Sequence, residues 1–318
     1  MLAIAMAATG AAALAQSAAR YPSQPVTIVV PFAAGSAADG MTRLCAQELT
    51  RKLGQSFVVE NIGGASGTIG TDKVARSAPD GYNLVIASGA TVTVAPYLFP
   101  NLPYDPKRLV PVSTMGDSPI VVAVPAKSPI RSLAELVAAA RAAPGKLSFG
   151  SGGSGSAAHI AAEVFQWKTG TRFTHVPYRG VAASVPDLAA GRLDALFVSY
   201  PAVRPMTQAG SIRVLAVASE KRSDMVGMQV PTAAEAGVKD YVQSAWNGLM
   251  GPAGLPDEIV SKLNAALNEI LRDPAIVKRL AGMGMTPIPG TPAEFAKRID
   301  DETGEMQALT KITNISAN

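Results

Sequence analysis

The chain has 318 residues, a length that predicts about two domains. With 48% hydrophobic and 16% charged residues it is expected to fold around a large core, which excludes a disordered chain. The net charge of +4 comes from scattered Lys and Arg residues and only 5% of residues are aromatic, so there is no basic run or stacking surface and we expect no nucleic-acid partner.

Residues 1–20 are expected to form a secretory signal peptide that is removed. Leu2 begins an Ala-rich apolar run that ends at Leu14, is too short to cross a bilayer, and is followed by small residues typical of a cleavage site near Ala15. The basic segment usual before such a run is missing, because Leu2 directly follows Met1. The alternatives are a buried helix or a membrane anchor. We expect the mature protein to be exported.

Beyond residue 20, apolar runs typical of strands alternate with helical patterns, as in α/β proteins whose sheets are mainly parallel. The predicted strands cover residues 26–30, 57–60, 83–87, 120–124, 147–149, 173–176, 195–198 and 213–218. The predicted helices between them cover residues 41–52, 67–76, 132–141, 157–168, 182–190 and 203–209.

The last part of the chain reads as three helices over residues 256–271, 274–283 and 292–309, each with proline near its start. A helical tail of this kind is expected to pack back on the first domain. We predict that residues 21–120 and 240–318 form domain 1 and that residues 121–239 form domain 2. The ligand is expected between the domains, at the carboxyl ends of the strands.

Two loops with the same design carry the functional prediction. Residues 31–39 and residues 150–156 each follow a strand, are rich in Gly, Ser and Ala, and open directly into a helix. The free N–H groups of a helix start, together with the helix dipole, bind anions. Because the loops belong to different predicted domains, we expect them to face each other and hold a dicarboxylate.

The sequence lacks the complete motifs of the enzyme classes that its loops suggest. Residues 150–155 match G-x-G-x-x-G, but the next strand ends at Val176 and Pro177 without the acidic residue that a dinucleotide site needs about 20 positions on. Neither loop is followed by Gly-Lys-Ser/Thr, which excludes a Walker loop. Ser154 lies near His159 without a nucleophile elbow, so a capping serine and an inward-facing histidine are expected instead.

The sequence also contains few residues that could bind a metal ion or carry out redox chemistry. The two histidines and the single cysteine, Cys45, cannot supply a zinc site, and no disulfide within the chain is possible. Cys45 occupies an apolar helical position, where a buried and unreactive thiol is expected. We therefore expect no cofactor, no metal and no enzymatic activity.

Many short motifs in the chain resemble the Bug-type substrate-binding proteins of tripartite tricarboxylate transporters, from Tyr21 nearly to the end. These motifs are Tyr21-Pro22, Val30-Pro31-Phe32-Ala33-Ala34-Gly35, Val59-Glu60-Asn61, Gly67-Thr68-Ile69-Gly70, Ala78-Pro79-Asp80-Gly81-Tyr82, Leu102-Pro103-Tyr104-Asp105-Pro106, Val176-Pro177-Tyr178-Arg179-Gly180, Pro231-Thr232 with Glu235-Ala236-Gly237, and Pro252-Ala253-Gly254-Leu255-Pro256.

The resemblance implies a periplasmic receptor of two α/β domains that closes like a flytrap on a small organic carboxylate, held by backbone N–H groups and hydroxyls. The ligand-binding residues it implies in domain 1 are Phe32, Ala33, Ala34, Gly35, Ser36, Asp39, Ser88, Gly89 and Ala90. Those it implies in domain 2 are Ser151, Gly152, Gly153, Ser154, Gly155, Ser156, His159, Tyr178, Arg179, Ser199 and Tyr200.

Two of these residues depart from the family pattern or vary within it. Ser36 replaces a glycine, and Tyr200 is expected to narrow the pocket. The implied role is that of a monomer that delivers its ligand to the membrane subunits of a tripartite transporter. Presentation of the ligand to a membrane sensor kinase is an alternative, and an enzyme acting on a small carboxylate is a more distant one.

Overall fold

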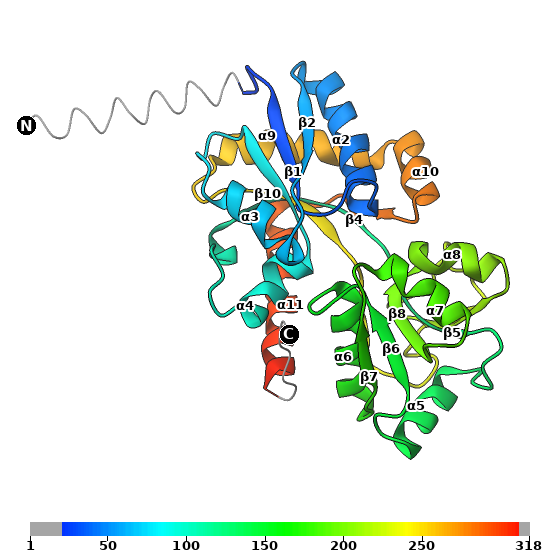
Figure 1. Ribbon diagram of the computed structural model, residues 1–318. Helices are drawn as coiled ribbons and strands as arrows, with labels where there is room; N and C mark the ends of the chain where they lie inside the picture. Colours follow the sequence, from blue (N-terminus) through cyan, green and yellow to red (C-terminus); the bar gives the residue numbers. More distant parts are fainter. Residues whose placement is uncertain (1–20, 312–318) are drawn as a thin grey trace, which may run out of the picture.

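The computed structural model describes residues 21–311, which form two lobes, each built on its own β-sheet with flanking helices (Figure 1). The predicted α/β fold with two domains is confirmed. The predicted signal peptide lies outside the described residues. Between residues 21 and 311, none of the helices has the length and apolar character that crossing a membrane requires.

The first lobe contains a six-stranded sheet in the order β11-β4-β10-β3-β1-β2. Its strands are β1 (Val26–Val30), β2 (Phe57–Asn61), β3 (Asn83–Ala87), β4 (Val110–Asp117), β10 (Asn247–Gly251) and β11 (Thr286–Pro287). Its helices are α2 (Ala37–Leu53), η1 (Ala65–Gly67), α3 (Thr68–Ala75), η2 (Ala90–Val94), α4 (Ala95–Leu98), η3 (Pro106–Arg108), α9 (Asp257–Arg272), α10 (Pro274–Gly282) and α11 (Pro292–Thr310).

The second lobe, green in Figure 1, contains a five-stranded sheet in the order β7-β6-β8-β5-β9. Its strands are β5 (Ile120–Pro125), β6 (Ser148–Ser151), β7 (Thr174–Pro177), β8 (Ala195–Ser199) and β9 (Ile212–Val217). Its helices are α5 (Leu133–Ala142), α6 (Ala157–Thr169), η4 (Val181–Ala183), α7 (Val185–Ala189) and α8 (Tyr200–Gln208).

Both sheets are more mixed than the sequence predicted. Strand β1 pairs in parallel with β2 and β3, and β6 pairs in parallel with β7 and β8. The other pairs are antiparallel: β10 with β3 and β4, β11 with β4, and β5 with β8 and β9. Strands β5 and β10, which follow the two crossings between the lobes, are each antiparallel to both of their neighbours.

The chain passes between the lobes twice, and the two crossings lie side by side. The first crossing joins β4 to β5 through Ser118 and Pro119, and the second leads back toward β10 through Ala245. Ser118 N donates to Ala245 O at 3.2 Å, and Ala245 N donates to Ser118 O at 3.0 Å. The hinge is therefore one short antiparallel pair of strands.

The last helix, α11, contacts both lobes. Its Phe295 is fully buried in a core cluster of the first lobe, whereas Met306 and Leu309 are buried in a cluster of the second lobe with Phe165 and Tyr241. Figure 1 shows α11, in red, beside the space between the lobes. Side chains on one helix are therefore shared between two hydrophobic cores.

Candidate functional site

A cleft of about 1010 Å³ separates the lobes. The loops that follow β1, β3, β6 and β8 open into it, each at the carboxyl end of its strand. Twelve of the predicted ligand-binding residues line this cleft: Phe32, Ala33, Ser36, Ser88, Gly89, Ala90, Gly152, Ser154, Gly155, Ser156, Arg179 and Ser199. The start of α2 and the start of α6 thus face the same cavity from opposite lobes.

In the first lobe, Asp39 holds the loop that precedes α2. Ser36 is the N-cap of α2, and its hydroxyl accepts a hydrogen bond from Asp39 N. The Asp39 carboxylate accepts from Gly35 N and from Asn61 Nδ2, both at 2.9 Å, and forms an ion pair with Arg43. Burial raises the pKa of Asp39, but hydrogen bonds from Arg43, Gly35 and Asn61 outweigh it, so the pKa is lowered.

In the second lobe, His159 holds the loop that precedes α6. Ser156 is the N-cap of α6, and Gly155 N donates to Nδ1 of His159 at 3.0 Å. Because Nδ1 accepts, the ring is neutral and its proton is on Nε2. Burial and the neighbouring His175 lower the pKa of His159 to about 4. The backbone of this loop is therefore oriented by an uncharged imidazole.

Gly155 fits this loop because of its conformation and its neighbour. Its φ is +76°, in the left-handed region that glycine favours, and a Cβ at this position would lie 1.9 Å from Leu98 Cδ1. Leu98 belongs to α4 of the first lobe. The second-lobe loop thus touches the first lobe directly at a residue that has no side chain.

Eight predicted residues do not line the cleft: Ala34, Gly35, Asp39, Ser151, Gly153, His159, Tyr178 and Tyr200. Some of them, such as Asp39 and His159, form hydrogen bonds that support the cleft loops. The Tyr178 hydroxyl donates to Asp187 at 2.6 Å. Tyr200 is 5% exposed and its N–H donates to Pro119 O of the hinge at 2.9 Å. Its phenol packs in the second-lobe core and does not narrow the cleft, contrary to our expectation.

Sequence reasoning missed a third loop of the first lobe. Residues 63–67 line the cleft between β2 and α3, and two of them, Ala65 and Ser66, have φ values of 45° and 55°. Non-glycine residues held in this region are strained, and such strain gathers at binding sites. The composition of the segment, Gly-Gly-Ala-Ser-Gly before a helix, repeats the pattern of the two loops that were recognised.

Charged groups in the cleft are few. Among the described residues that line it, Arg179 is the only cation and Glu302 is the only anion. The Glu302 carboxyl accepts a hydrogen bond from Nε1 of Trp246, and its Oε1 lies 3.0 Å from Oγ1 of Thr93. No sequence pattern points to Glu302, because this residue reaches the cleft from α11, far from both loops in the chain. Within residues 21–311, no group of His, Cys, Asp and Glu side chains is arranged to hold a metal ion.

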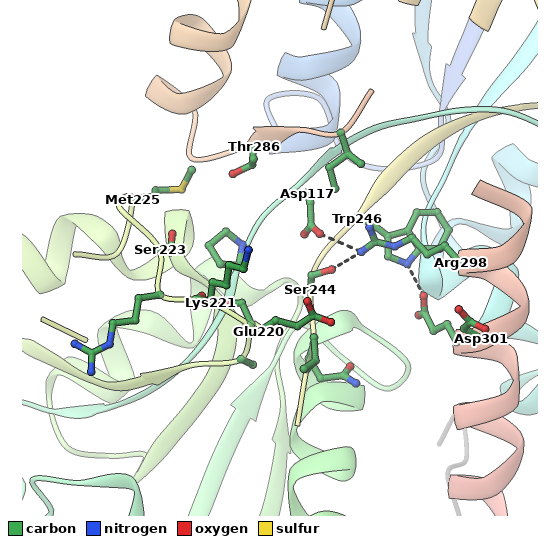
Figure 2. A pocket seen from close by; sticks show the side chains of 18 of the residues that line it. Asp117, Glu220, Lys221, Ser223, Met225, Ser244, Trp246, Thr286, Arg298 and Asp301 are labelled. Atoms are coloured by element: carbon green, nitrogen blue, oxygen red, sulfur yellow. Dashed lines mark hydrogen bonds and ion pairs between the residues drawn. The ribbon is translucent and has the colours of Figure 1, made fainter. Parts of the chain in front are cut away.

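A second cavity of about 1570 Å³ lies behind the hinge (Figure 2). Figure 2 shows Arg298 of α11 between Asp117 and Ser244, with Trp246 beside it. Arg298 Nη2 donates to Asp117 Oδ2 at 3.0 Å and to Ser244 Oγ at 2.5 Å, and the guanidinium lies 5.8 Å from the centre of the Trp246 ring. Both hinge crossings are therefore tied to α11 by one guanidinium.

Known proteins of the same kind share this architecture over nearly the whole chain. BugT of Bordetella pertussis is 40% identical over 308 residues, which are 96% of this chain and 94% of BugT. An R. palustris protein solved with adipate superposes with a TM-score of 0.82 at 34% identity, covering 92% of this chain and 97% of its own. MatC from Rhodopseudomonas palustris, solved with bound malate, has a TM-score of 0.79 at 30% identity, covering 91% and 99%.

The family assignment agrees with these relatives. Residues 41–315 match the family described as the tripartite tricarboxylate transporter family receptor. The match includes both lobes, the hinge and all but the first of the cleft loops. The chain therefore belongs to the tripartite tricarboxylate transporter receptor family, which is a family of solute-binding receptors and not of enzymes.

Proposed function

We propose that this protein captures a small organic carboxylate in the cleft between its lobes and delivers it, in the periplasm, to the membrane subunits of a tripartite tricarboxylate transporter. The observation that most directly supports this proposal is that the starts of α2 and α6 face one cavity from opposite lobes. Relatives solved with adipate and malate support a dicarboxylate, since two helix starts offer two places for anionic groups.

Hydrogen bonds must supply most of the affinity. A helix start contributes about 0.3 to 1 kcal/mol toward an anion, and about 2 when partly buried. A micromolar receptor needs about 8 kcal/mol, so two helix starts are not enough. Hydrogen bonds to a charged group contribute about 1.5 to 3 kcal/mol each. The N–H groups and hydroxyls of the Ser36, Ser66 and Ser154 loops are the donors we assign to this task.

Closure of the cleft brings those donors to the ligand from both sides. We place the two domains on either side of the paired crossings, with residues 21–120 and 240–318 in one and residues 121–239 in the other. The paired crossings, α11 and the contact of the Gly155 loop with Leu98 join the lobes, and each sheet lies wholly within one lobe, so a rotation about the hinge leaves the hydrogen bonds of both sheets intact. We expect a monomer whose radius of gyration falls when the ligand binds.

The test is a thermal-shift screen against a panel of small carboxylates, on protein unfolded and refolded to remove bound ligand. The proposal requires one or a few acids to raise the melting temperature with a dependence on concentration that follows mass action. Calorimetry then measures the affinity, and small-angle scattering measures the contraction. A panel of mono-, di- and tricarboxylates without any binder contradicts the proposal.

A further inference from the structure

We propose that Glu302 is a neutral carboxylic acid at neutral pH that donates a hydrogen bond to Thr93, and that this form favours anion binding by keeping negative charge out of the cleft wall. This inference rests on the proposed function for its link to binding. The state of Glu302 itself follows from the geometry around it and is testable without a ligand.

The two polar contacts of the Thr93 hydroxyl are best explained by a proton on Glu302. Thr93 Oγ1 lies 2.9 Å from the carbonyl oxygen of Gly89 and 3.0 Å from Oε1 of Glu302. A hydroxyl has a single proton to donate, and a carbonyl only accepts. Both contacts are satisfied together when Thr93 donates to Gly89 and Glu302 donates its own proton to Thr93.

The other oxygen of Glu302 fits the same assignment. Its Oε2 accepts from Nε1 of Trp246, which is the role of the carbonyl oxygen in a neutral acid. A neutral Glu302 thus has a donor oxygen toward Thr93 and an acceptor oxygen toward Trp246. An ionised Glu302 would have only acceptor oxygens and would compete with Gly89 for the single proton of Thr93.

The nearest cation is directed elsewhere. Arg298 precedes Glu302 by one helical turn, the usual spacing of a stabilising ion pair. Its Nη2 points instead at Asp117 and Ser244, as Figure 2 shows. Among residues 21–311, Glu302 forms no ion pair, and Asp117 is the partner of Arg298.

The surroundings of Glu302 favour its neutral form. Burial is the largest effect on the pKa of Glu302 and raises it, as does the charge of Glu305. The hydrogen bond from Trp246 and the charge of Arg298 lower the pKa, and so would a hydrogen bond donated by Thr93, but even with all three the net change is a rise. On the same helix, Nζ of Lys297 and Oδ2 of Asp301 form an ion pair at 2.6 Å. Lys168 of α6 lowers the pKa of Glu305.

Glu302 lies against a ligand loop as well as in the cleft wall. A Cβ at Gly89 would lie 2.3 Å from Oε1 of Glu302, so the carboxyl packs on the backbone of the loop that follows β3. Glu302 is also part of the cleft lining. A negative charge in the cleft wall would repel an anionic ligand, and we expect it to weaken binding by about tenfold or more.

The experiment compares Glu302→Gln with Asp301→Asn. Gln is uncharged and offers the same pair of donor and acceptor, so Glu302→Gln is expected to retain the affinity of the wild type near pH 7. Asp301→Asn makes the same replacement of a carboxyl by an amide at an adjacent, exposed residue that lines the second cavity and not the cleft. Affinities for the carboxylate found in the screen are measured by calorimetry from about pH 5 to about pH 9.

Wild type and Asp301→Asn are expected to lose affinity at least about tenfold toward alkaline pH, while Glu302→Gln changes less than about twofold. Equal pH profiles for wild type and Glu302→Gln overturn the proposal, as does a Glu302→Gln variant that is folded and does not bind near pH 7.

A second readout needs no ligand. The carboxyl carbon of Glu302 is observed by carbon NMR in ligand-free protein and assigned by its loss in Glu302→Gln. A chemical shift of a neutral acid near pH 7 supports the proposal, and that of a carboxylate overturns it. If the screen finds no binder, the proposed function fails while the carbon spectrum still decides the state of Glu302.

Discussion

The rings of His159 and His175 stack with centroids 4.2 Å apart beneath the loop that opens α6. His175 Nε2 lies 2.6 Å from Ser151 Oγ at the end of β6, and His159 accepts from Gly155 within the loop. The pKa of each histidine is lowered, in both cases mainly by burial. The loop over residues 150–156 therefore rests on two uncharged imidazoles.

This pair predicts a loss of stability in acid. His159 has a pKa of about 4 in the folded protein and about 6.5 when unfolded, so between these values the unfolded chain binds more protons. The free energy of unfolding is expected to fall by about 3 kcal/mol from His159 as the pH drops from about 7 to about 4.

Urea unfolding at several pH values measures this decline. In His159→Gln, an amide oxygen takes the place of Nδ1 as acceptor without titrating, so the decline is expected to be smaller than in the wild type. An identical decline in both proteins contradicts the assignment of the acid sensitivity to His159.

Gly155→Ala is expected to weaken both folding and binding. The new Cβ would meet Leu98 of the first lobe at 1.9 Å in a backbone with φ of +76°, a combination that costs about 1 to 3 kcal/mol or more. Gly153→Ala is the matched control, because its φ is +113° but its nearest neighbour is Tyr178 O at 3.5 Å. Chemical denaturation and calorimetry on both variants separate the clash from the backbone strain; equal losses would show that contact with Leu98 is unimportant.

Ser66→Gly is expected to change stability and affinity in opposite directions. Ser66 has a φ of 55°, and glycine adopts this conformation without the steric cost of a Cβ, which is about 1 kcal/mol. The same change removes a hydroxyl from the cleft, so carboxylate affinity is expected to fall about tenfold. Asp240→Gly, with a φ of 54° outside the cleft lining, is expected to gain stability and keep its affinity. Unchanged affinity in Ser66→Gly would remove this loop from the ligand site.

Asp39→Asn tests whether the first loop depends on a buried carboxylate. The variant keeps one carbonyl oxygen but loses the charge that holds Gly35 and Arg43, which is expected to cost about 1 to 3 kcal/mol of stability. Asp72→Asn breaks a surface pair with Arg76 and is expected to cost less than about 1 kcal/mol. Thermal unfolding compares the two; similar small losses would mean that Asp39 does not hold the loop.

Among the described strands, sequence reasoning found β1, β2, β3, β5, β6, β7, β8 and β9, and it missed β4, β10 and β11. Strand β10 was missed because Asn247-Gly248-Leu249-Met250-Gly251 reads as a turn, and its glycines are explained only by tertiary contacts. A Cβ at Gly248 would lie 2.3 Å from Phe295 of α11. Close approach between segments so far apart in the chain leaves no local pattern.

The same limit applies to the site. The position of the two helix starts follows from local patterns, since strand, Gly/Ser loop and helix are adjacent in sequence. Local patterns do not predict which side chains face the cleft. Asp39 is hydrogen-bonded to Asn61, and His159 is hydrogen-bonded to Gly155 of its own loop, so neither side chain lines the cleft. Glu302 reaches the cleft only through the packing of α11 on Trp246, a relationship that no spacing in the sequence encodes.

The strand order of the first sheet has a consequence for biosynthesis. Strand β10 lies between β3 and β4, although β10 begins at residue 247 and β4 ends at residue 117. Every strand of the second sheet lies between residues 120 and 217. In a chain that emerges N-terminus first, the second lobe can complete its sheet while the first lobe still lacks a central strand, so the lobe that begins first is the lobe that finishes folding last.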